Sequence, residues 1–208
     1  MILKYLAVGP LMANCFIIGC EETKKALVID PGDDVEQILI ELTENNLKLE
    51  YILNTHGHFD HAGGNNQLKS ATGAEIMIHK EDAPFLNVIS AKAKMFGLSA
   101  TDSPAADKFL EEGDIITCGT ITAKVIHTPG HSPGGLSFAI DNMLFVGDTL
   151  FDGSIGRTDF DGGDYNTLIK NIQNKLFAYD DDTKVYTGHG PSTTIGKEKR
   201  YNPFCKIK

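Results

Sequence analysis

Four apolar, strand-like runs of this chain each end in a short loop that carries histidine or aspartate. The run 49–54 leads into the loop 55–61, in which three histidines and one aspartate fall within six consecutive positions. Three later runs lead to His131, Asp148 and His189, and each of these residues lies beside a glycine. Because α/β folds gather their ligands at the carboxyl ends of strands, this pattern favours a fold that brings four strand ends to one rim.

The residue types in these loops indicate a metal site. Neutral imidazole is the commonest metal ligand among side chains, and carboxylates suit hard or borderline divalent ions. His56 and His58 stand two positions apart, so a turn can aim both at one ion, and Asp60 and His61 face a second position close by. A solvated polar loop would account for one His-x-His pair, but not for histidine and aspartate at three further strand ends. The sequence therefore predicts that these loops share metal ions.

Hydrophobic periodicity predicts many short strands and a few amphipathic helices. The region 81–107 is the least periodic and is expected to form short helix and loop, as a cap near the site. Strands followed by helices in each half favour an α/β (α+β) fold, an αββα sandwich of two packed mixed sheets flanked by helices. The expected strands are 2–8, 15–19, 25–30, 51–54, 75–78, 115–117, 121–127, 136–140, 143–146 and 184–186. The expected helices are 35–42, with Asp33 or Asp34 as N-cap, 64–71 and 165–177.

Length, charge and cysteine usage narrow the class of protein. At 208 residues the chain is expected to form a single domain, 1–208. Its net charge of -9 argues against nucleic acid as a partner, because phosphate binding requires lysine and arginine. No run approaches the ~18 apolar residues of a membrane span, and cysteines without a Cys-x-x-Cys pair are expected to be reduced thiols of a cytoplasmic protein. The apolar run 5–19 is interrupted by Pro10 and Asn14, so strands are expected there rather than a signal peptide.

Taken together, these loops resemble those of the metallo-β-lactamase superfamily. The order His-x-His-x-Asp-His, followed by a distant His, Asp and His, is highly specific, and the likeness runs from about Leu3 to Phe204. The chain is most similar to the glyoxalase II group of hydroxyacyl-thioester hydrolases, in particular to short bacterial members that lack the C-terminal helical substrate domain. The supporting stretches are 14–16, 28–32, 147–151, 156–160, 187–191 and 201–204.

This resemblance implies two divalent metal ions, with zinc as the first choice and iron or manganese as alternatives. The histidine at position 61 also distinguishes the chain from the most familiar β-lactamases, which carry arginine there, and this argues against antibiotic hydrolysis. The family pattern assigns His56, His58 and His131 to the first ion, Asp60, His61 and His189 to the second ion, and Asp148 to both.

The implied activity is hydrolysis of a small-molecule thioester, a hydroxyacyl-thiol conjugate similar to S-lactoylglutathione. The ions lower the pKa of a shared water to about 7, so a hydroxide is available at neutral pH to attack the carbonyl carbon. Asp60 and Asp148 are expected to act in catalysis, because they offset the charge of the ions and orient the hydroxide. Arg157 is a candidate for binding a carboxylate of the substrate, and a surface ion pair with Asp159 or Asp161 is the alternative for this residue.

Three other functions remain open from the sequence. A persulfide dioxygenase shares the fold and most of the motif residues, and would hold one iron through His56 or His58 together with His131 and Asp148. A lactone hydrolase is a further alternative. A metal-binding protein without catalysis fits less well, because the ligand set leaves coordination positions open.

Two further histidines are expected not to bind metal. His79 ends a strand and has no carboxylate or histidine beside it in the sequence. His127 precedes His131 by four positions, but Pro129 and Gly130 exclude a helix between them. His127 is therefore expected to hold a loop by hydrogen bonds.

Overall fold

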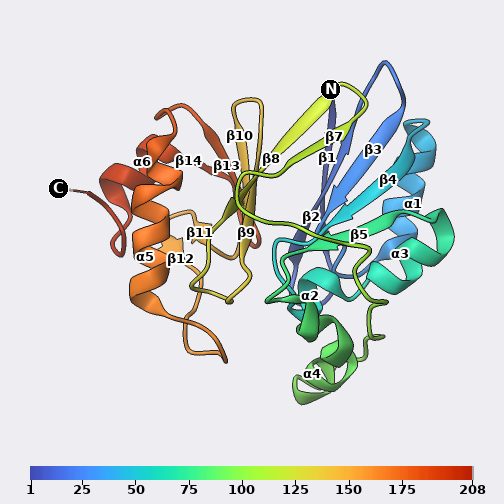
Figure 1. Ribbon diagram of the computed structural model, residues 1–208, viewed down its shortest axis with the longest axis horizontal. Helices are drawn as coiled ribbons and strands as arrows, with labels where there is room; N and C mark the ends of the chain where they lie inside the picture. The colour runs from blue at the N-terminus through green and yellow to red at the C-terminus, as the bar shows by residue number, and fades with distance from the viewer. Residues whose placement is uncertain (208) are drawn as a thin grey trace.

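Two six-stranded sheets pack face to face at the centre of the structure, a computed structural model that describes residues 1–207 (Figure 1). Helices α1 (Val35–Glu44) and α3 (Asn65–Thr72) cover the outer face of the first sheet. Helices α5 (Tyr165–Asn174) and α6 (Ile195–Tyr201) cover the outer face of the second sheet. This arrangement confirms the expected αββα sandwich.

The first sheet is built from the first half of the chain. Its strands follow one another in the order β1-β2-β3-β4-β5-β6, and those from β3 to β6 are parallel, so their carboxyl ends meet at one edge. Strands β1 and β2 add to it as an antiparallel hairpin. The strands are β1 (Ile2–Val8), β2 (Ala13–Gly19), β3 (Lys25–Ile29), β4 (Lys48–Leu53), β5 (Glu75–Ile78) and β6 (Lys108–Phe109).

The second sheet has the strand order β14-β13-β10-β9-β8-β7. Strands β10 and β13 pair in parallel, and the other pairs of this sheet are antiparallel. A separate small hairpin, β11 (Leu150–Phe151) and β12 (Ser154–Ile155), follows β10. The strands of the sheet are β7 (Ile115–Cys118), β8 (Ile121–His127), β9 (Leu136–Ile140), β10 (Met143–Gly147), β13 (Lys184–Thr187) and β14 (Thr193–Thr194).

Strand β2 illustrates why the centre of the molecule is apolar on both faces of a sheet. All of its residues are buried, and successive side chains of a strand point to opposite faces. Cys15 and Ile17 pack into the core beneath α1 and α3, whereas Phe16 and Ile18 pack between the two sheets. Phe138 of β9 meets them there from the second sheet and is fully buried.

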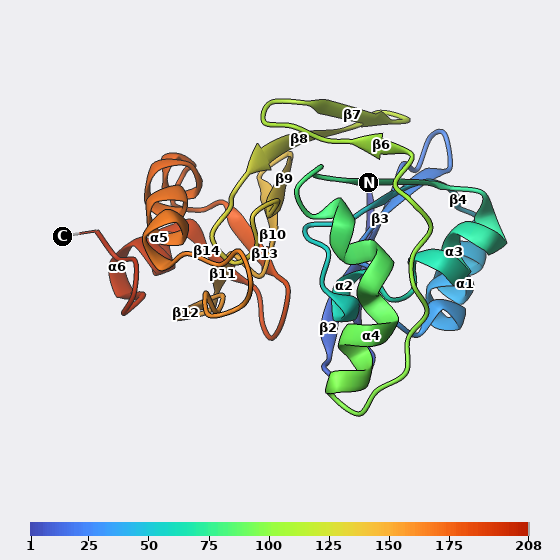
Figure 2. The same ribbon diagram turned by 60° about the horizontal axis from the view of Figure 1, so that its bottom comes forward.

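Short helices gather at the end of the first sheet where β4 ends (Figure 2). They are α2 (Phe59–Ala62), the 3-10 helix η1 (Ala83–Val88) and α4 (Ile89–Met95). The last two lie within the region 81–107, which confirms the expectation of short helix and loop in that region.

Most expected elements are confirmed to within a few residues, and the differences have local causes. The helix expected over 165–177 ends at Asn174, and a separate 3-10 helix, η2 (Leu176–Ala178), follows it. Asp34 occupies the N-cap position of α1 but does not cap it, because its backbone is left-handed (φ 49°) instead of extended. Its Oδ2 accepts a hydrogen bond from the backbone N–H of Gly9 at 2.8 Å. The elements β6, β11, β12, β14, α2 and α6 were not expected, because runs this short show little periodicity.

Three remaining expectations concern the chain as a whole. The four cysteines are free and buried, as the sequence predicts. Within residues 1–207, no helix combines the length and the apolar character needed to cross a membrane. Lys208, the last residue of the expected domain 1–208, lies outside the described residues.

Candidate metal centre

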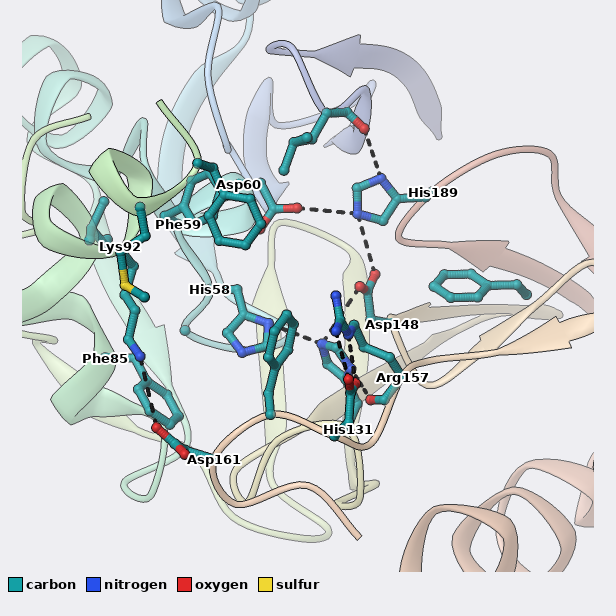
Figure 3. A pocket seen from close by; sticks show the side chains of 18 of the residues that line it. His58, Phe59, Asp60, Phe85, Lys92, His131, Asp148, Arg157, Asp161 and His189 are labelled. Atoms are coloured by element: carbon teal, nitrogen blue, oxygen red, sulfur yellow. Dashed lines mark hydrogen bonds and ion pairs between the residues drawn. The ribbon is translucent and has the colours of Figure 1, made fainter. Parts of the chain in front are cut away.

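Loops that follow β4, β8, β10 and β13 meet at one edge of the sandwich and bring the candidate ligands together (Figure 3). Helix α2 begins directly after the first of these loops, with His58 at its N-cap position in an extended conformation. This single turn of helix carries Asp60 and His61, which face His189 from the second sheet.

His56, His58 and His131 form the first group of candidate ligands. One ring nitrogen of each lies within 4.8 Å of the others. Nε2 of His131 and Nδ1 of His58 are only 3.0 Å apart. Three imidazole nitrogens that converge in this way can hold one divalent cation, as the sequence predicts.

Asp60, His61 and His189 form the second group, again with ligand atoms within 4.8 Å of one another. Nε2 of His189 lies 3.2 Å from Nε2 of His61 and 3.3 Å from Oδ2 of Asp60. This set combines two imidazoles with a carboxylate, which also suits a divalent cation.

Asp148 lies between the two groups. Its Oδ2 is 3.6 Å from Nε2 of His131 in the first group. Its Oδ1 is 3.4 Å from Nε2 of His61 and 3.8 Å from Nε2 of His189 in the second group. Each carboxylate oxygen therefore faces a different group, which is the arrangement that a bridging carboxylate requires.

Hydrogen bonds on the far side of the rings orient two of the histidines. Nδ1 of His131 donates to the backbone carbonyl of Arg157 at 2.8 Å. Nδ1 of His189 donates to the backbone carbonyl of Leu11 at 3.1 Å. A proton held on Nδ1 leaves the lone pair of Nε2 free for a metal ion.

Asp30, at the end of β3, orients histidines of both groups. It is buried and accepts hydrogen bonds from the backbone N–H of Thr55 at 2.7 Å, from the Thr55 hydroxyl at 2.5 Å and from Nδ1 of His61 at 3.1 Å. The hydroxyl oxygen of Thr55 lies 3.0 Å from Nδ1 of His56 and accepts its proton. Asp30 is close enough to His56 and His61 to form a third metal-binding set. Since hydrogen-bond donors already occupy both of its oxygens, Asp30 orients the two imidazole rings and is not counted among the candidate ligands.

Asp82 ties together the two loops of the first group. Its carboxylate is fully buried and accepts hydrogen bonds from the backbone N–H of Gly57 at 3.0 Å, that of Gly134 at 2.6 Å and the hydroxyl of Ser132 at 2.7 Å. Gly57 separates the first two histidines of the group, and Ser132 follows the third. A Cβ atom at Gly57 or Gly134 would lie 2.6 or 2.7 Å from backbone atoms of Asp82, so these positions require glycine.

Asn14, at the start of β2, holds the loop of His189. Its side-chain amide donates to the backbone carbonyls of Thr187 and Gly190 at 2.9 Å each. Its backbone N–H donates to the carbonyl of Gly188 at 2.7 Å. These three bonds explain why a buried asparagine interrupts the apolar run near the N-terminus.

Burial and neighbouring charges set the protonation of the two groups. Burial, together with the nearby histidines, lowers the pKa of His56 well below its usual value and that of His58 to about 4. Both rings are therefore neutral at pH 7, as metal ligands must be. Burial also disfavours a charge on His61, but the carboxylates of Asp148 and Asp60 outweigh it and raise the pKa of His61 to about 10. A cation at the second group would thus replace a proton.

Two buried polar atoms of the ligand set fit a bound cation. Nε2 of His56 and Oδ1 of Asp148 have no hydrogen-bond partner within residues 1–207. A buried polar atom without a partner costs about 1–3 kcal/mol and is rare in native structures. An imidazole nitrogen and a carboxylate oxygen are both ligands of zinc, iron and manganese, so the residues present fit such ions.

A cavity of about 780 Å³ opens beside the two groups (Figure 3). This volume suits a small organic molecule. Its walls come from η1, α4 and the segment 151–161, which confirms the expectation that part of the region 81–107 lies near the site. The candidate ligands that line it are His58, Asp60, His131, Asp148 and His189.

Arg157 lines the same cavity, and its side chain is paired. Its Nε and Nη2 atoms donate to the carboxylate of Asp159 at 2.7 Å each. Its guanidinium carbon lies 3.8 Å from the ring centroid of Phe160. Of the two arrangements considered from the sequence, the structure contains the ion pair with Asp159. The sequence did not indicate that the backbone carbonyl of Arg157 holds His131.

The two histidines expected to be structural lie together outside the ligand set. The rings of His79 and His127 stack with centroids 4.2 Å apart. Nε2 of His127 donates to the backbone carbonyl of Pro133 at 3.1 Å. This bond supports the loop that carries His131, as expected for His127.

Comparisons with known proteins agree with this architecture. The family model described as the metallo-beta-lactamase superfamily matches residues 8–189. The hydroxyacylglutathione hydrolase GloC of Haemophilus influenzae is 41% identical over 212 residues, which cover 100% of each chain. The crystal structure of BLEG-1 B3 metallo-beta-lactamase is 36% identical with a TM-score of 0.92, over 99% of this chain and 100% of that one. The crystal structure of TTHA1623 in a di-iron-bound form is 36% identical with a TM-score of 0.89, over 97% of this chain and 99% of that one. The chain therefore belongs to the metallo-β-lactamase superfamily.

Proposed function

We propose that this chain is a binuclear metal hydrolase that cleaves hydroxyacyl thioesters. The position of Asp148, with one carboxylate oxygen toward each group of candidate ligands, is the observation that carries the binuclear scheme. The full-length match to a hydroxyacylglutathione hydrolase supports the substrate class.

Each group would hold one divalent ion, zinc by first preference, and Asp148 would contact both. Two ions bound there would supply an activated water at neutral pH and would polarise the thioester carbonyl. The ligands in this proposal are His56, His58 and His131 for one ion, Asp60, His61 and His189 for the other, and Asp148 for both.

Asp60 has a second task in this scheme, the orientation of the attacking water. Without ions, burial disfavours the ionised form of Asp60, but the charge of His61 and the hydrogen bond from His189 outweigh burial and lower its pKa below its usual range. An ion held by His61 and His189 would take the place of these protons and would favour the ionised carboxylate in the same way. The carboxylate of Asp60 therefore stays ionised and can accept a hydrogen bond from that water. The departing thiolate needs little protonation, because a free thiol has a pKa of only about 8.5.

The test combines metal analysis with an assay of S-lactoylglutathione hydrolysis, followed by release of thiol. We expect about two ions per chain and metal-dependent cleavage. Asp148→Ala should lose metal and nearly all activity, because the side chain faces both groups. Full activity at one ion per chain would contradict the binuclear scheme, and a fully loaded protein that leaves the thioester intact would contradict the substrate class.

Hydrolysis of β-lactams is the second candidate, because a crystal structure 36% identical to this chain is that of a B3 metallo-beta-lactamase. A chromogenic cephalosporin tested on the same preparation decides whether the expectation against antibiotic hydrolysis holds. An oxygen electrode with glutathione persulfide tests the persulfide dioxygenase. Oxygen uptake without thioester cleavage would show that the chain is a persulfide dioxygenase and not the proposed hydrolase. An assay with a lactone substrate tests the lactone hydrolase.

A further inference from the structure

One wall of the cavity is far more apolar than cleavage of a small hydroxyacyl group requires. Its side chains come from α2, η1, the α4 region and the loop after β12, and they are Phe59, Phe85, Ile89, Met95, Phe96 and Phe160. Met95 is 77% exposed and Phe96 is 52% exposed, although both are apolar and neighbour the site. Exposed apolar side chains that gather around a cavity indicate an apolar ligand.

The aromatic part of this wall reaches the candidate ligands. The ring of Phe85 lies 6.0 Å from the ring of His58, and the ring of Phe160 lies 5.5 Å from it. An apolar group between these rings is therefore only a few atoms from a carbonyl that reacts beside His58. The guanidinium of Arg157 packs against Phe160 at 3.8 Å and supports that ring.

The charged groups on this side of the cavity are paired with one another. Arg157 binds Asp159, and Nζ of Lys92 on α4 lies 3.9 Å from Oδ2 of Asp161 (Figure 3). The second pair links α4 to the loop that carries Phe160, so it joins the two sides of the apolar wall. Because these charged groups bind one another, a ligand group between Phe85 and Phe160 would make mainly apolar contacts.

The chemistry of thioesters indicates which half of the substrate lies there. Thiol carriers built on cysteine or pantetheine continue from sulfur through one or two CH₂ or CH groups to polar amides, so they offer little apolar surface near the reacting carbon. The acyl half has no such restriction. We infer that this wall is an acyl subsite, and that the preferred thioesters carry an aromatic or branched apolar acyl group. The inference rests on the thioesterase function proposed above.

A matched pair of substrates tests it. Lactoyl- and mandeloylglutathione share the thiol and the α-hydroxyl group and differ only in methyl against phenyl. The rate of base hydrolysis without enzyme corrects kcat/KM for intrinsic reactivity. We expect the corrected kcat/KM of the wild-type chain to favour mandeloyl about tenfold or more, because burial of the added carbons stabilises the bound acyl group.

Substitutions of the wall locate the preference. Phe85→Ala and Phe160→Ala should each bring the mandeloyl-to-lactoyl ratio down about fivefold, whereas Phe160→Leu should retain most of it. Phe109→Ala is the matched control, because Phe109 is 53% exposed on β6 and does not line the cavity. Metal content and circular dichroism confirm that each variant is folded and loaded.

Each result separates the two proposals. If both thioesters are cleaved with a corrected ratio near one, the acyl subsite is wrong and the thioesterase stands. A preference that survives unchanged in both alanine variants also overturns the acyl subsite. If neither thioester is cleaved by the metal-loaded chain, the proposed thioesterase fails and the inference fails with it.

Discussion

At the scale of single residues, two buried carboxylates divide the work of holding the candidate ligands. Within the described residues, the carboxylate of Asp82 bonds to the two loops of the first group. Asp30 holds His61 of the second group directly, and it holds His56 of the first group through Thr55. Mutation of a residue that orients a liganding histidine typically lowers metal affinity 10–100-fold.

Asp82→Asn is expected to weaken metal binding at the first group by about 10–100-fold and to leave the second group loaded. An amide keeps one acceptor oxygen but turns an NH₂ group toward N–H and O–H donors, so at least one of the three hydrogen bonds is lost. Titration of the metal-free chain with Co²⁺, followed by absorption spectroscopy, measures the two affinities separately.

Asp30→Asn is the matched comparison for Asp82→Asn, because it exchanges the same atoms at a carboxylate that serves both groups. This variant should weaken both affinities. An equal loss from both groups in Asp82→Asn, with an unchanged thermal midpoint, would contradict the division of labour between the two residues.

Arg157→Ala is expected to raise KM for a thioester whose thiol carries carboxylates, by about fivefold, which corresponds to about 1 kcal/mol. The effect should be modest, because the guanidinium is exposed and must leave Asp159 to bind the substrate. Asp159→Asn should have the opposite effect, a lower KM, since it releases the guanidinium. A thioester without carboxylates is the control, and an unchanged KM in Arg157→Ala would remove this residue from substrate binding.

The candidate ligands could be predicted from the sequence, whereas the residues that hold them could not. Histidine and aspartate beside glycine at a strand end are visible in one short stretch each. The contacts of Asp82 run to loops 25 and 52 positions away, and those of Asn14 run 173 and 176 positions away. Nothing local distinguishes these side chains from other polar residues, because their role depends on the packing of the two sheets.

At the scale of elements, the long strands and helices could be predicted because one period repeats across each. Helix α5 places Leu168 and Ile172 four positions apart on its buried face. Strands of two residues, such as β6 and β14, carry no period and are defined only by the neighbour with which they pair. The expected N-cap at Asp34 is absent for a reason that is also not local, because this side chain bonds to Gly9, 25 positions away, and its backbone is left-handed.

Gly188→Ala is expected to disable the loop after β13 while the sandwich stays folded. The added Cβ would lie 2.1 Å from Oδ1 of Asp148 and 2.8 Å from the backbone carbonyl carbon of Gly147, so the Asp148 side chain and the loop backbone must shift. A displacement of about 1 Å at a reacting centre can cost about 100-fold in rate. Thioester kcat and metal content measure the effect. Ser192→Ala, exposed in the same loop, should retain both, and a fully active Gly188→Ala chain would show that the contact is not needed.

At the scale of the whole molecule, the candidate metal centre joins the two halves of the sandwich. Four of its ligands follow strand β4 of the first sheet, and the other three follow strands of the second sheet. The core between the sheets, with Phe16 on one side and Phe138 on the other, brings these strand ends together. The sandwich could be predicted from the sequence, because a sheet whose strands are apolar on both faces must be covered by helices or by a second sheet on each side.

Bound ions should therefore stabilise the folded chain, because an unfolded chain does not assemble ligands from both halves. At a free ion concentration of about 100 times Kd, the expected gain in unfolding free energy is about 2.7 kcal/mol per site. For a chain of this size that gain raises the midpoint of thermal unfolding by about 5–10 °C for one site. Calorimetry of the chelator-treated chain, before and after addition of Zn²⁺, measures the shift. Asp148→Ala, which lacks the carboxylate between the groups, should gain much less from Zn²⁺. Equal midpoints with and without Zn²⁺ in the unsubstituted chain would mean that the ions do not join the two halves.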